Sequence, residues 1–419
     1  MPLKILFTEG SSTSARQTLY ALGRLGYTID VCDSQRLCLA RFSRYVRRFY
    51  RCPSFTADPL GYLDFLVGRL RREHYDVLFP VHDQIYLLAR FPEVFQGLTA
   101  VALPPLASIV QLQSKVGFWR LLAELDLPQP RTTVVSGPAA LADACEFPCY
   151  VKLDYSTAGR GVWRVENQHD LRTVIDVLQR RGAPEGAPPG ELIVQEAVAG
   201  VLHATQAVFA HGELVAAASY RARATGVGGS AHGRQSIAQP TACQHLVKLG
   251  RRLAWHGAMH IEAMCEPGAD NPVYIEANPR IGETMNATLS GVNLSDLMVH
   301  VSLGDEPRRG LLGAEGTRTH SVLMALMAKA ESGQGRRAVL AELWRAWKAR
   351  DVYHDSQDEL TRPREDPLSL LPAMVVVAQL LLAPGISRRI VRRAVDNYGL
   401  TAEAVRRIDA LPARPARSA

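Results

Sequence analysis

One short segment, residues 273–280, constrains the fold more than any other part of the sequence. Its letters, VYIEANPR, begin as a strand and end at a proline, which removes a backbone donor and helps to stop that strand. Residues two apart in a strand face the same side, so Glu276 and Asn278 present two oxygen ligands about 7 Å apart at their α-carbons. We therefore expect this strand to form one wall of a cation site.

A second carboxylate comes from the preceding strand-like run, 259–264. If a hairpin across 265–272 joins the two strands, Glu262 lies opposite the ligands of the first wall. Oxygen ligands with few carboxylates suit Mg²⁺, which takes its remaining ligands from phosphates. Arg280, directly after the proline, could reach a transferred phosphoryl group or a substrate carboxylate, with a surface ion pair as the alternative.

A lysine followed closely by a loop of small residues is the next feature. Lys152 lies in the strand-like run 149–153, and Ser156, Gly159 and Gly161 come soon after it. A lysine on a strand can place its charge on phosphates, while glycines allow backbone N–H groups to approach them. The loop lacks the Gly-Lys-Ser/Thr of a P-loop, and an ordinary hairpin turn would have a similar sequence.

Two further segments could belong to the same site. Lys115 lies near the start of a helix expected over 113–125, where a solvent-exposed lysine is the alternative. A buried-strand pattern leads into Gln195 and Glu196. The extended backbone beyond it, around Val198, could recognise the edge of an adenine ring while apolar neighbours hold the ring.

The first 105 residues alternate between short apolar runs and helical stretches. Strands at 5–7, 27–32 and 75–80 with helices between them predict an open parallel α/β sheet. The loop 9–14 opens the first helix and could hold an anion there. It lacks the GxGxxG pattern, so a simple helix cap is an equal alternative.

Two stretches lie outside these motifs. Residues 182–190 contain Pro, Gly and Ala without an apolar period, which predicts a surface loop. The run 368–383 is the most apolar part of the C-terminal region, but Pro372 and Gln379 interrupt it, and it falls short of the ~20 apolar residues of a spanning helix. We expect a buried helix there and no membrane span, with a weak peripheral membrane contact through 368–393 as the alternative.

Composition limits the partners and the location. The net charge of +7 comes mostly from scattered arginines without interleaved aromatic residues, so we expect no nucleic-acid binding, and anionic small substrates fit the charge equally well. The seven cysteines are odd in number and contain no CxxC pair, which argues against a disulfide framework or a zinc site. No signal-peptide pattern is visible, and we expect a cytoplasmic protein.

In this order and at these separations, the four segments resemble the ATP-grasp superfamily, particularly its carboxylate–amine ligases related to carbamoyl phosphate synthase and biotin carboxylase. The resemblance covers about residues 1–305. It implies a Rossmann-like pre-ATP-grasp α/β domain at 1–105 and an α+β ATP-grasp domain of two subdomains at 106–305. A mainly helical C-terminal extension would occupy 306–419. Dimers are common in the superfamily, so a homodimer is expected as a possibility.

The resemblance also implies how ATP is held. Lys115 and Lys152 match the two lysines that bind its phosphates, and the segment 156–161 matches the mobile phosphate loop. The adenine-binding linker is matched by Gln195, Glu196 and Val198. His203 stands where the family commonly has a ribose-binding acid, which is a departure from the pattern.

For the metal, the resemblance implies Mg²⁺, with Mn²⁺ as a substitute, and the ligands Glu262, Glu276 and Asn278. Arg280 matches the arginine that steadies the acyl-phosphate step. The segments 156–161 and 225–234 would close over the site to exclude water. In or beside the second of them, Arg221, Arg223, His232 and Arg234 could grip a substrate carboxylate or simply be solvated.

The implied reaction is ADP-forming ligation of two small molecules. ATP phosphorylates a carboxylate, and an amine or a similar nucleophile then displaces phosphate, so that ADP and phosphate are released. Two alternatives stay open. The chain could be a carboxylase-type subunit that uses bicarbonate, or a non-catalytic regulator that binds ATP.

Overall fold

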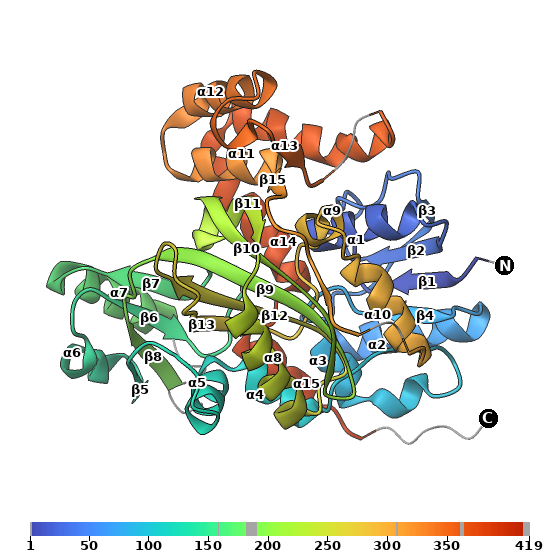
Figure 1. Ribbon diagram of the computed structural model, residues 1–419, viewed down its shortest axis with the longest axis horizontal. Helices are drawn as coiled ribbons and strands as arrows, with labels where there is room; N and C mark the ends of the chain where they lie inside the picture. The colour runs from blue at the N-terminus through green and yellow to red at the C-terminus, as the bar shows by residue number, and fades with distance from the viewer. Residues whose placement is uncertain (1, 158, 182–190, 307–308, 361–363, 414–419) are drawn as a thin grey trace.

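The computed structural model describes residues 2–157, 159–181, 191–306, 309–360 and 364–413. Within these ranges the strands form three sheets, with helices packed around and between them (Figure 1). We call them the N-terminal sheet, the small sheet and the central sheet. The surface loop predicted at 182–190 lies outside the described residues.

The N-terminal sheet is parallel, as predicted, with the order β3-β2-β1-β4. Its elements are β1 (Lys4–Phe7), α1 (Thr13–Gly23), β2 (Thr28–Asp33), β3 (Val46–Arg51), α2 (Pro59–Arg72) and β4 (Val77–Phe79). Strand β3 was not predicted from the sequence. This strand lies at the sheet edge and carries three arginines in VRRFYR, so it shows no apolar run.

The loop 9–14 caps helix α1 with its own side chains. Glu9 Oε2 accepts hydrogen bonds from the backbone N–H groups of Ser11 at 2.6 Å and Ser12 at 2.9 Å. Ser12 Oγ in turn accepts from Ala15 N at 2.9 Å. The Glu9 carboxylate occupies the position that a bound anion would take, so the helix-cap alternative is the correct one.

The small sheet is antiparallel with the order β5-β8-β6-β7. Its strands are β5 (Thr132–Ser136), β6 (Cys149–Leu153), β7 (Val162–Val165) and β8 (Glu191–Glu196). The helices α6 (Leu141–Ala144) and α7 (Gln168–Arg181) share an apolar core with it, in which Leu141, Val151 and Leu171 are fully buried. This packing leaves the opposite side of the sheet for Lys152.

The central sheet is long, mostly antiparallel, and has the order β13-β12-β9-β10-β11-β15-β16, with β14 beside β10. The strands are β9 (Val201–Ala210), β10 (Glu213–Thr225), β11 (Ala231–Ile237), β12 (Gly257–Cys265), β13 (Val273–Asn278), β14 (Leu311–Leu312), β15 (Arg318–His320) and β16 (Gln357–Asp358). Helices accompanying it are α8 (Pro240–Leu253), α9 (Met285–Leu289) and α10 (Leu294–Leu303).

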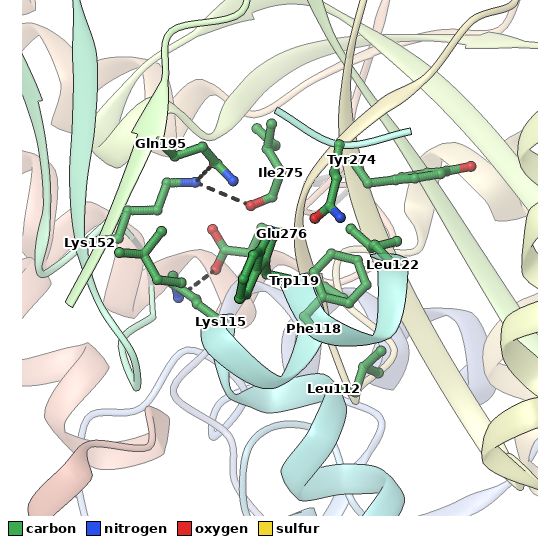
Figure 2. Close-up of a pocket in the computed structure, with 13 residues that line it drawn as sticks. Leu112, Lys115, Phe118, Trp119, Leu122, Lys152, Gln195, Tyr274, Ile275 and Glu276 are labelled. Atoms are coloured by element: carbon green, nitrogen blue, oxygen red, sulfur yellow. Dashed lines mark hydrogen bonds and ion pairs between the residues drawn. The ribbon is translucent and has the colours of Figure 1, made fainter. Parts of the chain in front are cut away.

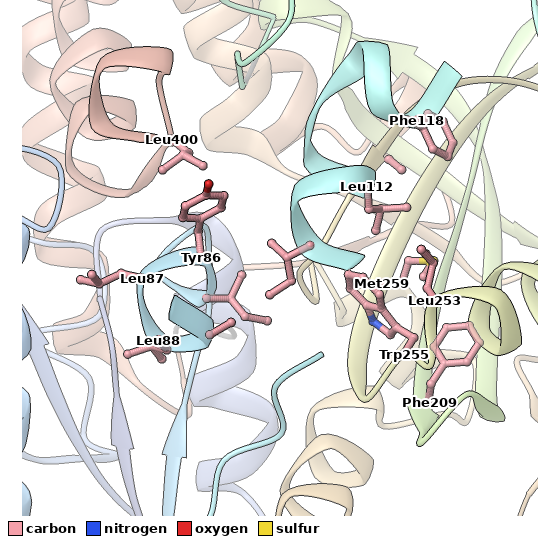
Figure 3. Packing of buried hydrophobic residues seen from close by; sticks show 14 of the residues in the cluster. Tyr86, Leu87, Leu88, Leu112, Phe118, Phe209, Leu253, Trp255, Met259 and Leu400 are labelled. Atoms are coloured by element: carbon pink, nitrogen blue, oxygen red, sulfur yellow. The ribbon is translucent and has the colours of Figure 1, made fainter. Parts of the chain in front are cut away.

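A continuous apolar cluster joins the N-terminal part to the central sheet. Figure 3 shows Leu87 and Leu88 of α3 (Ile85–Arg90) on one side and Leu112, Trp255 and Met259 on the other. Leu112 belongs to α4 (Leu106–Gln113), which is followed by α5 (Lys115–Glu124). The helix expected over 113–125 is α5, which Ser114 caps; Gln113 belongs instead to α4, a helix that the sequence pattern did not predict.

The C-terminal region is mainly helical and folds back on the rest of the chain (Figure 1). Its helices are α11 (Val322–Glu331), α12 (Gly335–Trp347), α13 (Leu371–Leu382), α14 (Ser387–Tyr398) and α15 (Ala402–Asp409). The strands β14, β15 and β16 also come from this region and pair within the central sheet. The boundaries at 105 and 305 stay predictions.

Helix α13 is less buried than the sequence suggested. Leu380 is fully buried, but Met374 is 62% exposed and Leu382 79% exposed, because only one side of the helix packs on α11 and α12. Within the described ranges, every helix is too short or too polar to cross a bilayer. Contact of residues 368–393 with a membrane surface stays a prediction.

Candidate active site

The two strands that carry the predicted metal ligands form an antiparallel hairpin, as expected. Glu262 on β12 pairs directly with Glu276 on β13, and His260 pairs with Asn278. Since alternate residues of a strand share a face, the two carboxylates and the Asn278 amide lie on the same side of the central sheet. The hairpin thus brings the three predicted ligands together.

The electrostatics of this cluster favour a cation. Burial raises the pKa of Glu262 to about 7, and the nearby negative charge of Glu276 adds to the rise. In the described part of the chain, no group of three or more His, Cys, Asp and Glu side chains is arranged to hold a metal ion. A metal here would have two carboxylates and one amide, which leaves positions for oxygens of a ligand.

Lys152 reaches from the small sheet to the central sheet (Figure 2). Its Nζ donates to Gln195 Oε1 at 2.6 Å and to the backbone oxygen of Ile275 at 3.2 Å. Burial lowers the pKa of Lys152 to about 8, although the opposite charge of Glu276 counteracts the shift. Lys152 and the predicted linker residue Gln195 therefore meet the ligand-bearing strand β13.

Lys115, the first residue of α5, points to the same place. Its Nζ lies 3.5 Å from Glu276 Oε1 and donates to the backbone oxygen of Ser156 at 3.0 Å. Asp154 fixes the start of the helix, because its Oδ1 accepts from Ser114 Oγ at 2.6 Å and from Val116 N at 3.0 Å. Asp154 was not predicted as a site residue, although it follows Lys152 by only two residues.

A narrow cavity separates these walls (Figure 2). Lys115, Lys152 and Glu276 line one part of it, and Phe118 and Leu122 of α5 line the apolar part. The cavity volume is about 10 Å³, enough for roughly one water molecule. Charged and apolar groups thus converge on one narrow slot between α5, β6, β8 and β13.

The predicted adenine linker lies at the end of β8. Glu196 N donates to Arg131 O at 3.0 Å, and Ala197 N donates to Pro148 O at 3.2 Å, so both groups are already used within the small sheet. Val198 is the next residue whose backbone N–H could face a ligand. The chain beyond Glu196 leaves the strand, as an adenine-reading linker would require.

The glycine loop touches the turn between β10 and β11. Gly159 and Gly161 both have positive φ, 69° and 76°. A Cβ atom at Gly159 would lie only 2.4 Å from Gly228 Cα, so the two backbones are in direct contact. The segment 225–234, expected to close over the site, is largely a hairpin, with β10 extending to Thr225 and β11 beginning at Ala231. Residue 158 lies outside the described ranges.

Arg280 extends the site toward the N-terminal sheet. Its guanidinium donates to Asn278 Oδ1 at 3.2 Å and to Asp83 Oδ1 at 3.2 Å. Asp83 is fully buried and lies beyond the end of strand β4. Asp83 was not predicted as a site residue, although the carboxyl ends of parallel strands are where α/β sheets place functional groups.

Two predicted residues have other partners. Arg234 is buried, and its two terminal nitrogens pair with Glu283 and Glu359, so the guanidinium is not free to grip a substrate as expected. His203 lies next to Ala204 on β9, and Ala204 pairs with Glu262, so His203 points to the opposite face of the sheet. There its Nδ1 lies 2.9 Å from Gln239 Nε2, away from the ligand cluster.

No protein-family model and no curated protein sequence matches this chain. Solved structures do resemble it. The Aspergillus clavatus carboxyaminoimidazole ribonucleotide synthase complexed with ATP is 17% identical, with a TM-score of 0.61 over 90% of this chain and 99% of that one. The Bacillus licheniformis L-amino acid ligase is 16% identical, with a TM-score of 0.55 over 73% of this chain and 75% of that one.

The Rhizobium etli pyruvate carboxylase also matches, at 19% identity and a TM-score of 0.57 over 73% of this chain. The match spans only 29% of the length of that much longer enzyme. These likenesses show that the chain has an ATP-grasp fold with mixed α/β sheets. At this level of identity they carry the fold alone.

Proposed function

We propose that this chain is an ATP-dependent, ADP-forming ligase that activates a carboxylate as an acyl phosphate and joins it to an amine or a similar nucleophile. The approach of Lys115 Nζ to Glu276 Oε1, 3.5 Å apart, carries the proposal. It places cationic groups for phosphate oxygens directly opposite oxygen ligands for a divalent metal. The ATP-grasp fold and solved neighbours that are synthases and ligases support it.

In this proposal ATP lies in the slot between the small sheet and β13. Lys115 and Lys152 hold its phosphates together with the loop bearing Ser156, Gly159 and Gly161, and the linker from Gln195 through Glu196 to Val198 holds adenine. Lys152 exchanges its bonds to Gln195 and Ile275 for phosphate oxygens. The cavity of about 10 Å³ is far smaller than a nucleotide, so the proposal requires the side chains and strands that line the slot to move apart when ATP enters.

The proposed metal is Mg²⁺, held by Glu262, Glu276 and Asn278. Two carboxylates and an amide fit this ion because phosphate oxygens and water supply its other ligands. The raised pKa of Glu262 supports the fit, since a cation beside the pair offsets the repulsion between the two carboxylates. When bound, the ion would offset negative charge on the phosphoryl oxygens.

The chemistry would proceed in two displacements. An oxygen of the substrate carboxylate attacks the γ-phosphorus, and the bond from phosphorus to ADP breaks. The amine nitrogen then attacks the acyl carbon, the carbon–oxygen bond to phosphate breaks, and the nitrogen loses a proton. Arg280 lies 3.2 Å from the ligand Asn278, which suits contact with the phosphoryl oxygens in both steps.

Arg234 cannot bind a substrate carboxylate while its guanidinium is paired with Glu283 and Glu359. A substrate carboxylate would have to displace Glu283 or Glu359 from the guanidinium before Arg234 could bind it. We propose that Arg234 contacts the substrate only after such a displacement. His203 is left without a part in ATP binding. Cytoplasmic location and a homodimer stay predictions.

The test is phosphate release from ATP and Mg²⁺ across a panel of carboxylates and amines. We expect at least one pair to give ADP, phosphate and the joined product. A double variant, Glu276→Ala with Asn278→Ala, should lose turnover while its far-UV circular dichroism stays that of the wild type. Undiminished turnover in this variant would remove the proposed metal site.

A second arm separates the alternatives. Phosphate release that requires bicarbonate, with a carboxylated product, would indicate the carboxylase-type reaction in place of ligation. Equilibrium ATP binding without phosphate release across the whole panel would favour a non-catalytic regulator. Calorimetry measures nucleotide binding in both cases, so that a protein that binds ATP without turnover is told apart from one that does not bind ATP.

A further inference from the structure

The end of helix α14 brings the C-terminal region back to the centre of the molecule. Residues 396–400, which we call the return segment, comprise the last residues of α14 and the start of its connection to α15. Helix α15 then packs against α2 and α3 (Figure 1). No motif in the sequence marks this segment, yet its contacts reach two of the proposed functional elements.

The return segment is firmly attached to the N-terminal sheet. Asn397 is buried, and its Nδ2 donates to Ser11 Oγ at 3.1 Å and to Asp33 Oδ1 at 3.0 Å. The ring of Tyr398 packs on the His82 ring, with centroids 4.2 Å apart. Buried hydrogen bonds and ring packing together hold this segment in one place.

From there the segment reaches Arg280 through a single carboxylate. Leu400 N donates to Asp83 Oδ2 at 2.8 Å, while the other oxygen of Asp83 accepts from Arg280 Nε at 3.2 Å. Arg280 in turn donates to the proposed metal ligand Asn278. Because each oxygen of Asp83 has its own donor, the Leu400 N–H fixes the carboxylate orientation that Arg280 meets.

The same segment touches the glycine loop. Asp396 Oδ1 lies 2.6 Å from Arg160 Nη1. Gly399 lies against Thr157, so closely that a Cβ atom at residue 399 would be 2.4 Å from Thr157 Cγ2. Any larger residue at 399 would therefore push against the loop.

We propose that the return segment is a positioning element of the ligase site, which clamps the glycine loop through Asp396 and Gly399 and orients Arg280 through Asp83. The inference rests on the function proposed above for the loop and for Arg280. It assigns a role in catalysis to the C-terminal region, which contains none of the motif residues.

The clamp is tested with Gly399→Ala and a matched control, Gly385→Ala. A Cβ atom at Gly385 would meet nothing within 4 Å, and both glycines lie in the C-terminal region. We expect Gly399→Ala to weaken equilibrium ATP binding about tenfold, since crowding a packed contact displaces one partner, and Gly385→Ala to leave it unchanged. Cleavage by trypsin after Arg160, measured without nucleotide, should also become several-fold faster in Gly399→Ala alone.

A second substitution tells a local clash from general damage. Thr157→Ser removes Cγ2, the atom that a Cβ atom at 399 would meet first. Within the Thr157→Ser background, Gly399→Ala should cost much less ATP affinity and loop protection than it does in the wild type. An equal loss in both backgrounds, or equal trypsin rates for Gly399→Ala and Gly385→Ala, would overturn the clamp.

The link to Arg280 has a different signature. Asp83→Asn should lower kcat about tenfold or more while the KM for ATP stays nearly constant, because the Asp396 and Gly399 contacts with the loop are untouched, whereas the Arg280 guanidinium, like the neighbouring His82 ring, loses the negative charge of Asp83. A rise in KM for ATP with unchanged kcat would overturn this link. If the wild-type protein binds no ATP, the ligase proposal fails, but the trypsin comparison still decides whether the segment clamps the loop.

Discussion

Glu262 and Glu276 face each other in register across strands β12 and β13, with the side chains only 23% and 22% exposed. Two like charges in a largely buried setting disfavour ionisation of both, so this arrangement costs stability. Like charges held close together in the folded protein are typical of functional sites. Replacing one member of the pair should therefore change the free energy of unfolding and the turnover in opposite directions.

Glu262→Gln should separate these two properties. Removing one of the facing charges while keeping the shape should raise the free energy of unfolding by about 1–2 kcal/mol in the absence of divalent cations. The same change should abolish Mg²⁺-dependent phosphate release, because the metal loses a carboxylate. Urea unfolding with EDTA and a Mg²⁺ titration of turnover are the two measurements.

Glu266→Gln is the matched control for that variant. Glu266 follows strand β12 and is exposed, so its replacement should change neither quantity. A Glu262→Gln protein that turns over normally at low Mg²⁺ would show that Glu262 does not hold the metal. One that loses stability would show that the carboxylate pair is not repulsive in the folded state.

Lys152→Met keeps the length and the apolar stem of the buried side chain but removes its charge. We expect ATP binding to weaken about 10- to 100-fold, the loss typical of a charge-assisted hydrogen bond inside a protein. Calorimetric titration with ATP and Mg²⁺ measures it. Lys248→Met, at an exposed position on α8, is the control and should bind as the wild type does. Equal affinities of the two variants would contradict the phosphate role of Lys152.

The hairpin of β12 and β13 could be predicted from the sequence because its information is local. The alternation around Glu276 and Asn278 gives the face, and the short connection to Glu262 gives the pairing. Lys115 and Lys152 could be predicted for a related reason, because Lys115 begins a helix and Lys152 lies in a strand, and each of these elements has its own local pattern. Periodicity and the resemblance together were enough for these residues.

Other parts of the site depend on contacts between distant segments, which no local pattern encodes. Asp83 meets Leu400 and Arg280, residues that belong to the C-terminal region and to the end of the central sheet. Arg234 was expected to grip a substrate, but its partner Glu359 comes from beyond the predicted ATP-grasp domain. Once the chain folds, such partners decide whether a charged side chain is free.

Gly159→Ala tests the contact between the glycine loop and the β10–β11 turn. A Cβ atom there would collide with the backbone of Gly228, whereas a Cβ atom at Gly229, which also has positive φ, would meet nothing within 4 Å. Both alanines carry a similar conformational cost, so their difference reports the collision. We expect Gly159→Ala to release several times more phosphate per joined product than Gly229→Ala, because looser closure admits water to the acyl phosphate. The ratio of phosphate to product, measured in one reaction, checks it.

Glu9 should make stability depend on pH. Burial raises its pKa from the ordinary 4.5 to about 7, and the charge of Asp33 adds to the rise. Between these two values the folded protein keeps the proton that the unfolded chain has lost, so the free energy of unfolding falls as pH rises through this window and levels off above it.

Glu9→Gln removes this contribution. Between about pH 5 and about pH 8, the free energy of unfolding of the wild type should therefore fall by about 2–3 kcal/mol relative to that of Glu9→Gln. Urea unfolding at both pH values measures it, with the exposed Glu315→Gln as the control. Parallel pH profiles for wild type and Glu9→Gln would mean that the hydrogen bonds from Ser11 and Ser12 keep Glu9 ionised throughout this range.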